Sequence, residues 1–391
     1  MKEWKINLSH YMKKVLFVTN HYIDQNFGGP NATKSFIYAF SSIYKNITLV
    51  CPDYEGSSIS NYVPQGVRCI PCYDRRSLFK KVIDVYRGKV TRYTEFLEQH
   101  LRSNQYDVIV IDHSKIWADN TDCLCASKAT IVTIHHNVEK NYLRDNPINI
   151  LIRFPYNHYS LKAEKDAIYC SDLNLTLTEN DKRDLISAYP NIKGRFGYIG
   201  AFEYQSFSFG ANDICDLKTF IITGNLSFKQ TSTPVMVFLK KYLPVLEKLV
   251  PDVKVIIAGR NPNNAVINEC KKHRSIELIA NPNDMLPLLQ RSSLYICPTD
   301  KGSGQKLRIS DGLKCGLPVI CHINSLSGYE KMQEQSYVIT YNDTESFKEA
   351  VLIALGNMNK RVDIANAYNN FYSFEAGTNR LRSILYNESL L

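Results

Sequence analysis

Short, continuous apolar runs recur along the whole chain and alternate with segments whose apolar residues are three or four positions apart. The runs are rich in Val, Ile and Leu rather than alternating apolar with polar residues, which is typical of strands covered on both faces. Such strands belong to parallel sheets flanked by helices, so the pattern predicts an α/β fold. The expected strands are 14–19, 46–51, 107–112, 130–135 and 173–178, then 219–224, 253–259, 276–280, 294–298, 317–322 and 337–340.

The expected strands fall into two sets. Each set opens with a strand, a glycine-bearing turn and a helix, and the second set restarts this order at Thr219. This predicts two doubly wound domains, 1–205 and 206–368, facing a central cleft. The segment 194–216 has glycines and no sustained period, so it is the expected linker.

Ligands of open α/β sheets bind beyond the carboxyl ends of the strands. Functional residues are therefore expected in the loops that follow strands. These loops are 20–31, 112–113, 135–139, 224–230, 259–262 and 298–311.

The segment 75–104 has a helical pattern, with apolar residues every three or four positions and many basic residues between them. The pattern favours a helix packed on the core with a solvated face. The alternative is a basic amphipathic surface that rests on anionic lipid.

Composition narrows the class of protein. The chain has 391 residues, 44% hydrophobic and 22% charged, which is typical of a globular protein with two or three domains. No apolar run approaches the roughly 18 residues of a membrane span, and residues 1–14 do not resemble a signal peptide, so a cytoplasmic protein is expected.

The 11 cysteines are scattered and odd in number, which favours reduced thiols. Cys69 and Cys72 lie in a strand-like run, and Cys123 and Cys125 lack a matching second pair, so no metal site is expected. The net charge of +9 indicates an acidic partner: a nucleic acid, an anionic lipid or a phosphorylated ligand. Nucleic acid is the least favoured, because none of its usual recognition motifs is present.

The segment 300–322 combines two glycines, cations and one acid between two apolar strands. Gly302 and Gly304 allow close approach of the backbone, and a helix beginning near Gly304 would direct N–H groups and its dipole at a diphosphate. Lys306 adds charge, and Asp311, about 10 Å along such a helix, could bind ribose hydroxyls. The plain alternative is a turn with a solvated helix.

Other strand ends offer further candidates, each of which could also be an ordinary turn or surface residue. Gly224 and Asn225 follow a strand and precede a helix start suited to an anion, and Arg260 could contact phosphate oxygens. In the first domain the strand-end candidates are Gly28, Gly29, His113, His136 and Glu139.

Three segments together resemble the retaining GT-B glycosyltransferases of family four. They are DGLKCGLPV from Asp311, the segment 223–262 and HHNVEKNY from His135. The resemblance covers nearly the whole chain and implies two Rossmann-like domains, with the acceptor handled by the first and a nucleotide sugar by the second. The end of the chain, 369–391, resembles the family's final helix, which returns to the first domain.

The resemblance implies transfer of a hexose-like sugar from a UDP- or GDP-sugar to a hydroxyl of a growing or lipid-linked glycan. It implies retention of configuration, no metal ion and no further cofactor, as in polysaccharide biosynthesis at the inner face of a membrane. If the acceptor is lipid-linked, the alternative interpretation of segment 75–104 adds a peripheral contact with anionic lipid. No Asp-x-Asp motif, the metal site of the other common glycosyltransferase architecture, occurs in the chain.

The resemblance also implies roles for individual residues. His136, Lys306 and the backbone of Gly29 are expected at the transferring group, and Glu139 is expected to fix its loop. The expected donor-binding residues are Gly224, Asn225, Arg260, Gly302, Ser303, Gly304, Gln305, Lys306 and Asp311. The expected acceptor-side residues are Gly28, Gly29, His113 and Glu139.

Two positions depart from the family pattern. Ser303 stands where the first of the family's paired acids is expected, and Asp311 replaces the second Glu. The missing acid motivates a second possible function, that of a non-catalytic relative that binds a nucleotide sugar or glycan and acts through a partner. A third possibility is a nucleotide-sugar epimerase that shares the architecture.

Overall fold

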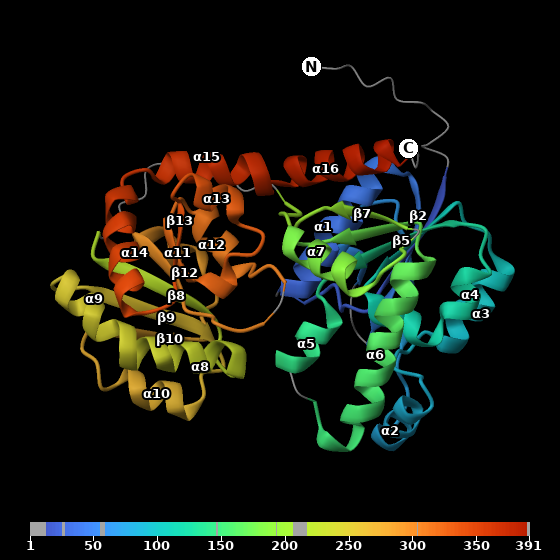
Figure 1. Cartoon of the computed structure of the whole chain (residues 1–391), viewed down its shortest axis with the longest axis horizontal. Coiled ribbons are helices and arrows are strands. Elements are labelled where there is room, and N and C mark those ends of the chain that lie inside the picture. Colours follow the sequence, from blue (N-terminus) through green and yellow to red (C-terminus); the bar gives the residue numbers. More distant parts are fainter. Residues whose placement is uncertain are drawn as a thin grey trace. The chain divides into compact units, whose positions relative to one another are not determined.

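The computed structural model describes residues 13–25, 28–54, 59–145, 148–192, 194–205, 217–302 and 304–388. The chain forms two compact units (Figure 1). Residues 1–205 together with 374–391 form the first unit, and residues 206–373 form the second. Each unit is described separately, and the cleft between the domains stays a prediction.

The first unit is built on a seven-stranded sheet with the order β3-β2-β1-β4-β5-β6-β7, in which all neighbouring strands are parallel. The apolar runs form its central strands, and β1 and β4 are buried almost throughout. The strands are β1 (Lys14–Thr19), β2 (Asn46–Asp53), β3 (Arg68–Tyr73), β4 (Val108–Asp112), β5 (Thr130–His135), β6 (Leu173–Thr176) and β7 (Arg195–Tyr198).

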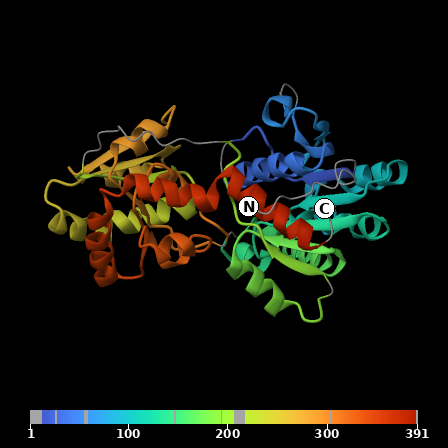
Figure 2. The ribbon, with the colours of Figure 1, turned by 90° about the horizontal axis from the view of Figure 1, so that it is seen from above.

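Helices cover both faces of this sheet. They are α1 (Gly28–Ile43), α2 (Leu78–Tyr86), α3 (Thr94–Ser103), α4 (Thr121–Cys125), α5 (Glu139–Asp145), α6 (Ile150–Cys170), α7 (Glu179–Ala188) and α16 (Phe374–Asn387). The last helix, α16, lies along α1 (Figure 2) and buries Leu381 and Leu385. The chain thus returns to the first unit at its carboxyl end.

The second unit repeats this plan with a six-stranded parallel sheet of order β10-β9-β8-β11-β12-β13. The strands are β8 (Thr219–Asn225), β9 (Lys254–Arg260), β10 (Ile276–Ala280), β11 (Leu294–Cys297), β12 (Val319–His322) and β13 (Val338–Tyr341). The helices are α8 (Lys229–Val237), α9 (Leu243–Leu249), α10 (Asn264–Cys270), α11 (Leu286–Arg291), α12 (Arg308–Lys314), α13 (Glu330–Glu334), α14 (Thr344–Asn357) and α15 (Arg361–Tyr372).

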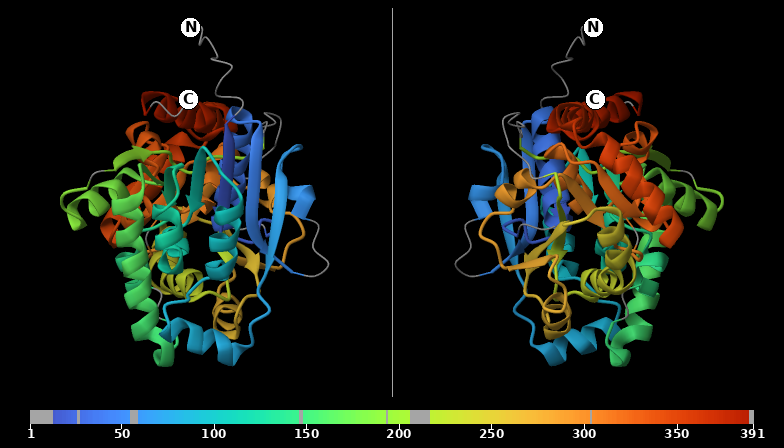
Figure 3. Two further views of the ribbon diagram at one scale, coloured as in Figure 1. Left: turned by 90° about the vertical axis from the view of Figure 1, so that its right-hand side faces the viewer. Right: turned by 90° about the vertical axis from the view of Figure 1, so that its left-hand side faces the viewer.

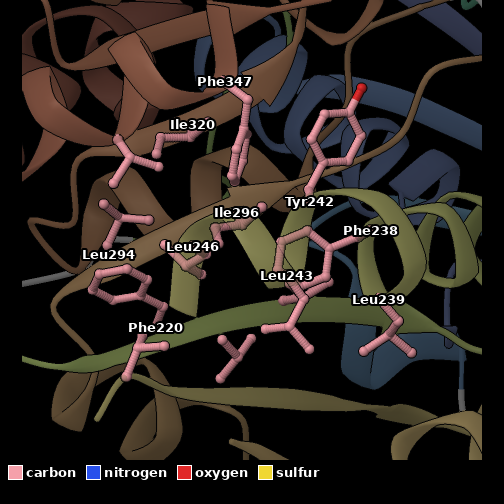
Figure 4. Packing of buried hydrophobic residues seen from close by; sticks show 14 of the residues in the cluster. Phe220, Phe238, Leu239, Tyr242, Leu243, Leu246, Leu294, Ile296, Ile320 and Phe347 are labelled. Atoms are coloured by element: carbon pink, nitrogen blue, oxygen red, sulfur yellow. The ribbon is translucent and has the colours of Figure 1, made fainter. Parts of the chain in front are cut away.

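The core of the second unit packs helices on both sheet faces. On one face, Phe220 of β8 and Ile296 of β11 lie with Phe238, Leu246 and Phe347 from the helices (Figure 4). A second cluster, with Ile309, Leu313 and Tyr368 among its members, covers the other face. Apolar residues of one strand therefore serve both faces, as the continuous runs predict.

The predicted fold class is confirmed, but three local predictions are wrong. The expected linker 194–216 contains a strand, β7, followed by irregular structure at 199–205, and residues 206–216 lie outside the described residues. The helix expected near Gly304 begins at Arg308. The closing segment 369–391 is not one helix, because α15 ends at Tyr372 and α16 begins at Phe374.

The helix expected over 75–104 is two helices, α2 and α3. Gly88, with φ of 80°, takes the left-handed conformation that ends a helix, and the Tyr159 ring of α6 packs on it. Leu97 of α3 is buried, as the core-packed interpretation predicts, but Leu78 and Phe79 of α2 are exposed. The core-packed interpretation is therefore wrong for α2.

Among the described residues, none of the helices combines the length and apolarity needed to cross a bilayer. The 10 cysteines within the described ranges are free, and six of them are buried.

Candidate active site

Both sheets have a switch point, where the strand order reverses and the connections leave toward opposite faces. In the first unit it lies between β1 and β4, and in the second between β8 and β11. Loops separate at such a point and leave room for a ligand beyond the carboxyl ends of the strands.

Asp112 is the centre of a buried polar cluster in the first unit. It ends β4, and its Oδ2 accepts hydrogen bonds from Thr19 Oγ1 at 2.7 Å and from Thr33 Oγ1 at 2.6 Å. Its Oδ1 lies 2.6 Å from His136 Nε2. Burial acts to raise the pKa of Asp112, but His136 and the hydroxyl donor outweigh it and the pKa is lowered. Asp112 is thus a buried carboxylate that fixes side chains from β1, α1 and the loop after β5.

His21 joins this cluster through Thr33. The single hydroxyl proton of Thr33 goes to Asp112, so His21 Nδ1, 2.8 Å from Thr33 Oγ1, is the donor in that contact. The other ring nitrogen, Nε2, then carries the lone pair. Burial, followed by His136, lowers the pKa of His21 to about 4, so the ring is neutral at pH 7.

Gly29 leaves space beside this ring nitrogen. A Cβ added at Gly29 would lie 2.7 Å from His21 Nε2, whereas one at Gly28 would meet nothing within 4 Å. Both glycines were expected in a turn before a helix, but they are the first two residues of α1. The glycine at position 29 therefore serves close approach to His21 rather than a reversal of the chain.

His113 and His136 complete a group of three histidines. Their rings stack with centroids 5.6 Å apart and planes 11° apart, and the His21 ring lies 4.9 Å from that of His136. His113 has φ of 105°, a backbone conformation that residues with a side chain rarely adopt and that clusters at functional loops. Burial, followed by Lys115, lowers the pKa of His113 well below its usual value. The rings come from the ends of β1, β4 and β5.

Glu139 lies at the end of the loop that carries His136, between β5 and α5. It is fully buried at the start of α5, and its Oε2 lies 3.4 Å from Lys115 Nζ. Its backbone N–H donates to Glu164 Oε2 at 2.5 Å. Burial raises the pKa of Glu139, and the Lys115 ammonium opposes the rise. The carboxylate thus faces a buried lysine and has no exposed surface, and its loop-fixing role stays a prediction.

The same cluster could be considered a metal site, because His21, Asp112 and His136 bring ligand atoms within 4.8 Å of one another. Both oxygens of Asp112 already accept hydrogen bonds from side chains around them. A divalent ion would have to replace those bonds. The hydrogen-bonded network is therefore the arrangement that these side chains fit.

In the second unit, Gly224 and Gly259 are paired at the carboxyl ends of β8 and β9. A Cβ added at Gly259 would lie 1.8 Å from the Gly224 carbonyl oxygen. A Cβ at Gly224 would lie 2.8 Å from Thr231 and 3.0 Å from the Arg308 guanidinium. Glycine at both positions lets the start of α8 and Arg308 come close to the sheet edge.

The loop after β11 carries the second part of this cluster. Gly302 and Gly304 have φ of 95° and 73°, and Lys306 Nζ donates to their carbonyl oxygens at 2.7 and 3.4 Å. Positive φ at both glycines keeps the segment out of a helix, which is why α12 begins only at Arg308. A diphosphate here would meet loop amides and cations rather than a helix N-terminus.

Arg308 joins the two segments. Its guanidinium donates to Thr231 Oγ1 of α8 at 3.2 Å and to Thr299 Oγ1 after β11 at 3.4 Å. The side chain of Gln230 lies 3.6 Å from the Cβ position of Gly302. Residues some 70 positions apart in sequence thus converge at the switch point of the second sheet.

The other predicted donor-binding residues differ in their exposure and in their contacts. Arg260 is exposed at the end of β9, paired in register with Asn225, whose Oδ1 accepts from Ser227. Gln305 packs on Gly328 rather than pointing into open space. Asp311 is partly exposed on the first turn of α12 and pairs with Lys314 at 2.9 Å. Ser303 lies outside the described residues.

A hollow among the described residues lies elsewhere in the first unit. About 1250 Å³ in volume, it is lined by Lys14 and Asp107, where β1 and β4 begin, and by residues of α3 and α4. It therefore lies at the amino ends of the strands, opposite the histidine cluster. Ligands of open parallel sheets bind beyond the carboxyl ends of the strands, so we place the candidate site at that edge.

Sequence reasoning missed several members of the two clusters. His21, Thr33 and the carboxylate of Asp112 were not among the candidate residues, although His21 and Asp112 lie in the loops marked as functional. Gln230 and Thr231 were likewise missed. The position of His21 and Asp112 at strand ends could have identified them as candidates. Thr33 lies one turn inside α1, and no feature of the sequence marked it.

The chain is similar to known proteins in sequence and in fold. Residues 218–357 match the family described as Glycosyl transferases group 1. A Klebsiella pneumoniae protein described as an uncharacterized 44.6 kDa protein in cps region is 23% identical over 279 residues, covering 68% of this chain and 70% of that relative.

Solved structures share the fold over almost the whole chain. TarM of S. aureus superposes with a TM-score of 0.68 and 11% identity, covering 96% of this chain and 99% of that one. The pneumococcal O-GlcNAc transferase GtfA gives 0.65 and 11%, with 96% and 99% covered. Anabaena HepE gives 0.63 and 11%, with 96% and 100% covered.

A group 1 glycosyl transferase segment, set in two parallel-sheet units of this shape, defines the class of the protein. The chain is a glycosyltransferase with the GT-B fold. The matched segment contains the whole sheet of the second unit and the Gly224–Arg308 cluster.

Proposed function

We propose that the chain transfers a hexose-like sugar from a nucleoside diphosphate sugar to a hydroxyl of a growing or lipid-linked glycan, with retention of configuration and without a metal ion. The observation that carries this proposal is the convergence of Gly224, Lys306 and Arg308 at one switch point within the matched segment. Two cations beside a glycine-rich loop suit a diphosphate.

In this scheme the second unit holds the donor. Lys306 leaves the Gly302 and Gly304 carbonyls to contact the diphosphate and stabilises the charge that builds on it as the sugar departs. Arg308 and Arg260 supply further cationic donors, and Asp311 accepts hydrogen bonds from the ribose. HepE and GtfA were each solved with UDP, which makes uridine the base to test first.

The first unit is proposed to handle the transferring sugar and the acceptor. Neutral His21 accepts a hydrogen bond at Nε2 from a sugar or acceptor hydroxyl, in the space that Gly29 leaves. His136, held by Asp112, orients the same group. We place this reaction in polysaccharide assembly at the cytoplasmic face of a membrane.

The test is nucleotide release from UDP- and GDP-sugars, with and without a panel of glycan acceptors, followed by anomeric analysis of the product. Lys306→Ala should lower turnover by about a hundredfold or more. Lys301→Ala, an exposed lysine of the same loop, is the matched control and should leave turnover unchanged.

Three outcomes contradict the proposal. Unchanged turnover in Lys306→Ala removes the role at the leaving group. Donor binding without transfer across the panel supports a non-catalytic relative. Sugar isomers or free nucleotide formed without an acceptor support an epimerase.

A further inference from the structure

Large apolar side chains are exposed at one end of the first unit, where α2 meets the start of α6. On α2, Leu78 and Phe79 are 82% and 77% exposed. On α6, Ile150, Leu151 and Phe154 are 77%, 71% and 84% exposed. Single exposed apolar residues are ordinary, but a group of five on two adjoining helices marks an interaction surface.

These two helices form one surface, here named the α2–α6 surface. Tyr86 at the end of α2 donates a hydrogen bond to the Leu151 carbonyl, and the Tyr159 ring of α6 packs on Gly88. The views agree that α2 lies beside the amino-terminal part of α6 (Figures 1 and 3). The exposed residues therefore belong to one packed pair of helices.

Basic side chains are in excess around the α2–α6 surface. Residues 75–92 and 148–163 contain nine of the 47 Lys and Arg of the chain and one acid, Asp84, a net charge of +8. Acids just outside these ranges pair with four of the nine basic side chains. Asp84 is buried and pairs with Arg76 at 3.2 Å. Lys80, Arg87 and Arg153 remain exposed.

The exposed apolar and basic side chains together indicate which kind of partner binds the α2–α6 surface. Exposed apolar side chains beside exposed lysines and arginines match the boundary between the headgroups and the acyl chains of an anionic bilayer. Long basic side chains reach the headgroups while the aromatic and aliphatic groups enter beneath them. A second copy of the chain would instead place like charges together.

We infer that the α2–α6 surface docks on an anionic membrane, with Phe79, Leu151 and Phe154 inserted at the level of the headgroups. This inference rests on the proposed function in one respect only: docking would bring the first unit to a lipid-linked acceptor. Binding to lipid by itself requires neither donor nor acceptor.

The experiment is flotation of the full chain with vesicles of phosphatidylglycerol and phosphatidylcholine, compared with phosphatidylcholine alone. We expect binding to the anionic vesicles, weakened by 0.5 M salt. The double variant Phe79→Ser/Phe154→Ser should lower the partition coefficient by about tenfold or more. Lys80→Glu/Arg153→Glu should lower it by at least about twentyfold, at roughly fivefold for each lost charge.

Leu352→Ser is the matched control, because Leu352 is 59% exposed on α14 of the second unit. It should bind vesicles like the parent chain. Equal binding by parent and both double variants, or no binding to anionic vesicles, overturns the inference. A parent dimer that the serine variant converts to a monomer, without vesicle binding, shows that the surface joins two copies instead.

Turnover with a water-soluble acceptor separates this inference from the proposed function. Docking variants that keep this turnover but do not bind vesicles support both proposals. If no donor and acceptor pair reacts while vesicle binding and its loss in the variants persist, the proposed function fails and the docking inference stands.

Discussion

Thr33 links His21 to Asp112, because its one hydroxyl group forms hydrogen bonds with both side chains. Thr33→Val keeps the shape of the side chain and removes that hydroxyl. We expect turnover to fall about tenfold or more, because the His21 tautomer is no longer fixed. Binding of the nucleoside diphosphate, measured by calorimetry, should be unchanged.

Thr121→Val is a suitable control. Its hydroxyl bonds Asp166 Oδ2 at 2.8 Å, away from the histidine cluster. Both variants should lose about 1 to 3 kcal/mol of unfolding free energy, since each leaves an acceptor short of a donor. A Thr33→Val protein with full turnover would show that the link between His21 and Asp112 has no part in the reaction.

His135 gives the protein a calculable dependence on pH. It is fully buried, with Nε2 2.8 Å from Asn174 Oδ1, and burial, partly offset by Asn174 and reinforced by His136, lowers its pKa from 6.5 to about 4. The unfolded chain binds the proton first as the pH falls, so stability is lost between pH 6.5 and pH 4. The full effect is of the order of 3 kcal/mol.

The measurement compares His135→Gln with the parent chain by denaturant unfolding at pH 7.5 and at pH 4.5. The variant should lose less stability between the two values than the parent does. The pKa of His21 is also lowered to about 4, so the difference between the two proteins is the informative quantity. An equal loss in both proteins would mean that His135 is not the group responsible.

At the scale of elements, the pairing of β8 with β9 depends on Gly259. Its Cβ position lies 1.8 Å from a backbone oxygen, which has no flexible end that could yield. Gly259→Ala should therefore cost about 3 kcal/mol or more of unfolding free energy. Gly356→Ala, on α14 with nothing within 4 Å of its Cβ position, should instead stabilise by about 0.5 to 1 kcal/mol.

Thermal and denaturant unfolding of the two glycine variants checks this pair. The two substitutions add the same methyl group, so their opposite signs isolate the contact at the strand ends. Destabilisation of both variants by similar amounts would contradict the contact with the Gly224 carbonyl.

At two places the hydrophobic period of the sequence predicted the bounds of a helix wrongly. The helical period over 75–104 continues across Gly88, but the glycine has a left-handed φ and ends α2. The same holds for Gly302 and Gly304, which delay α12 to Arg308. In each case glycine was the local signal, and its conformation depends on the tertiary contacts around it, which the period does not report.

At the scale of the whole molecule, the return of α16 to the first unit is tested at Gly377. A Cβ added there would lie 2.0 Å from the Phe202 ring, and Arg380 nearby donates to the Ile199 carbonyl at 2.9 Å. Gly377→Ala should destabilise the first unit by about 1 to 3 kcal/mol through overpacking. Ser383→Ala, on the exposed side of the same helix, should change stability by less than about 0.5 kcal/mol.

Hydrogen exchange resolved by peptide checks where the effect falls. Protection should decrease in peptides of α1 and α16 and stay the same in peptides of β8 and β9. Loss of protection confined to the second unit would contradict the assignment of α16 to the first.

The sequence by itself determined the two parallel sheets, since a continuous Val, Ile and Leu run is stable only when both faces are covered. It also determined which loops could carry chemistry, because the carboxyl ends of parallel strands share one edge. His136, His113, Gly224 and Lys306 were predicted on that ground, and the structure places each at such an edge.

Only the tertiary structure decided which side chains meet within those loops. The hydroxyl of Thr33 reaches Asp112 across 79 positions, and Arg308 reaches Thr231 across 77. Contacts of this kind depend on helix placement against a sheet and leave no period in the sequence. The exposure of α2 was decided in the same way, because a helix with an apolar stripe is buried only if a neighbour covers it.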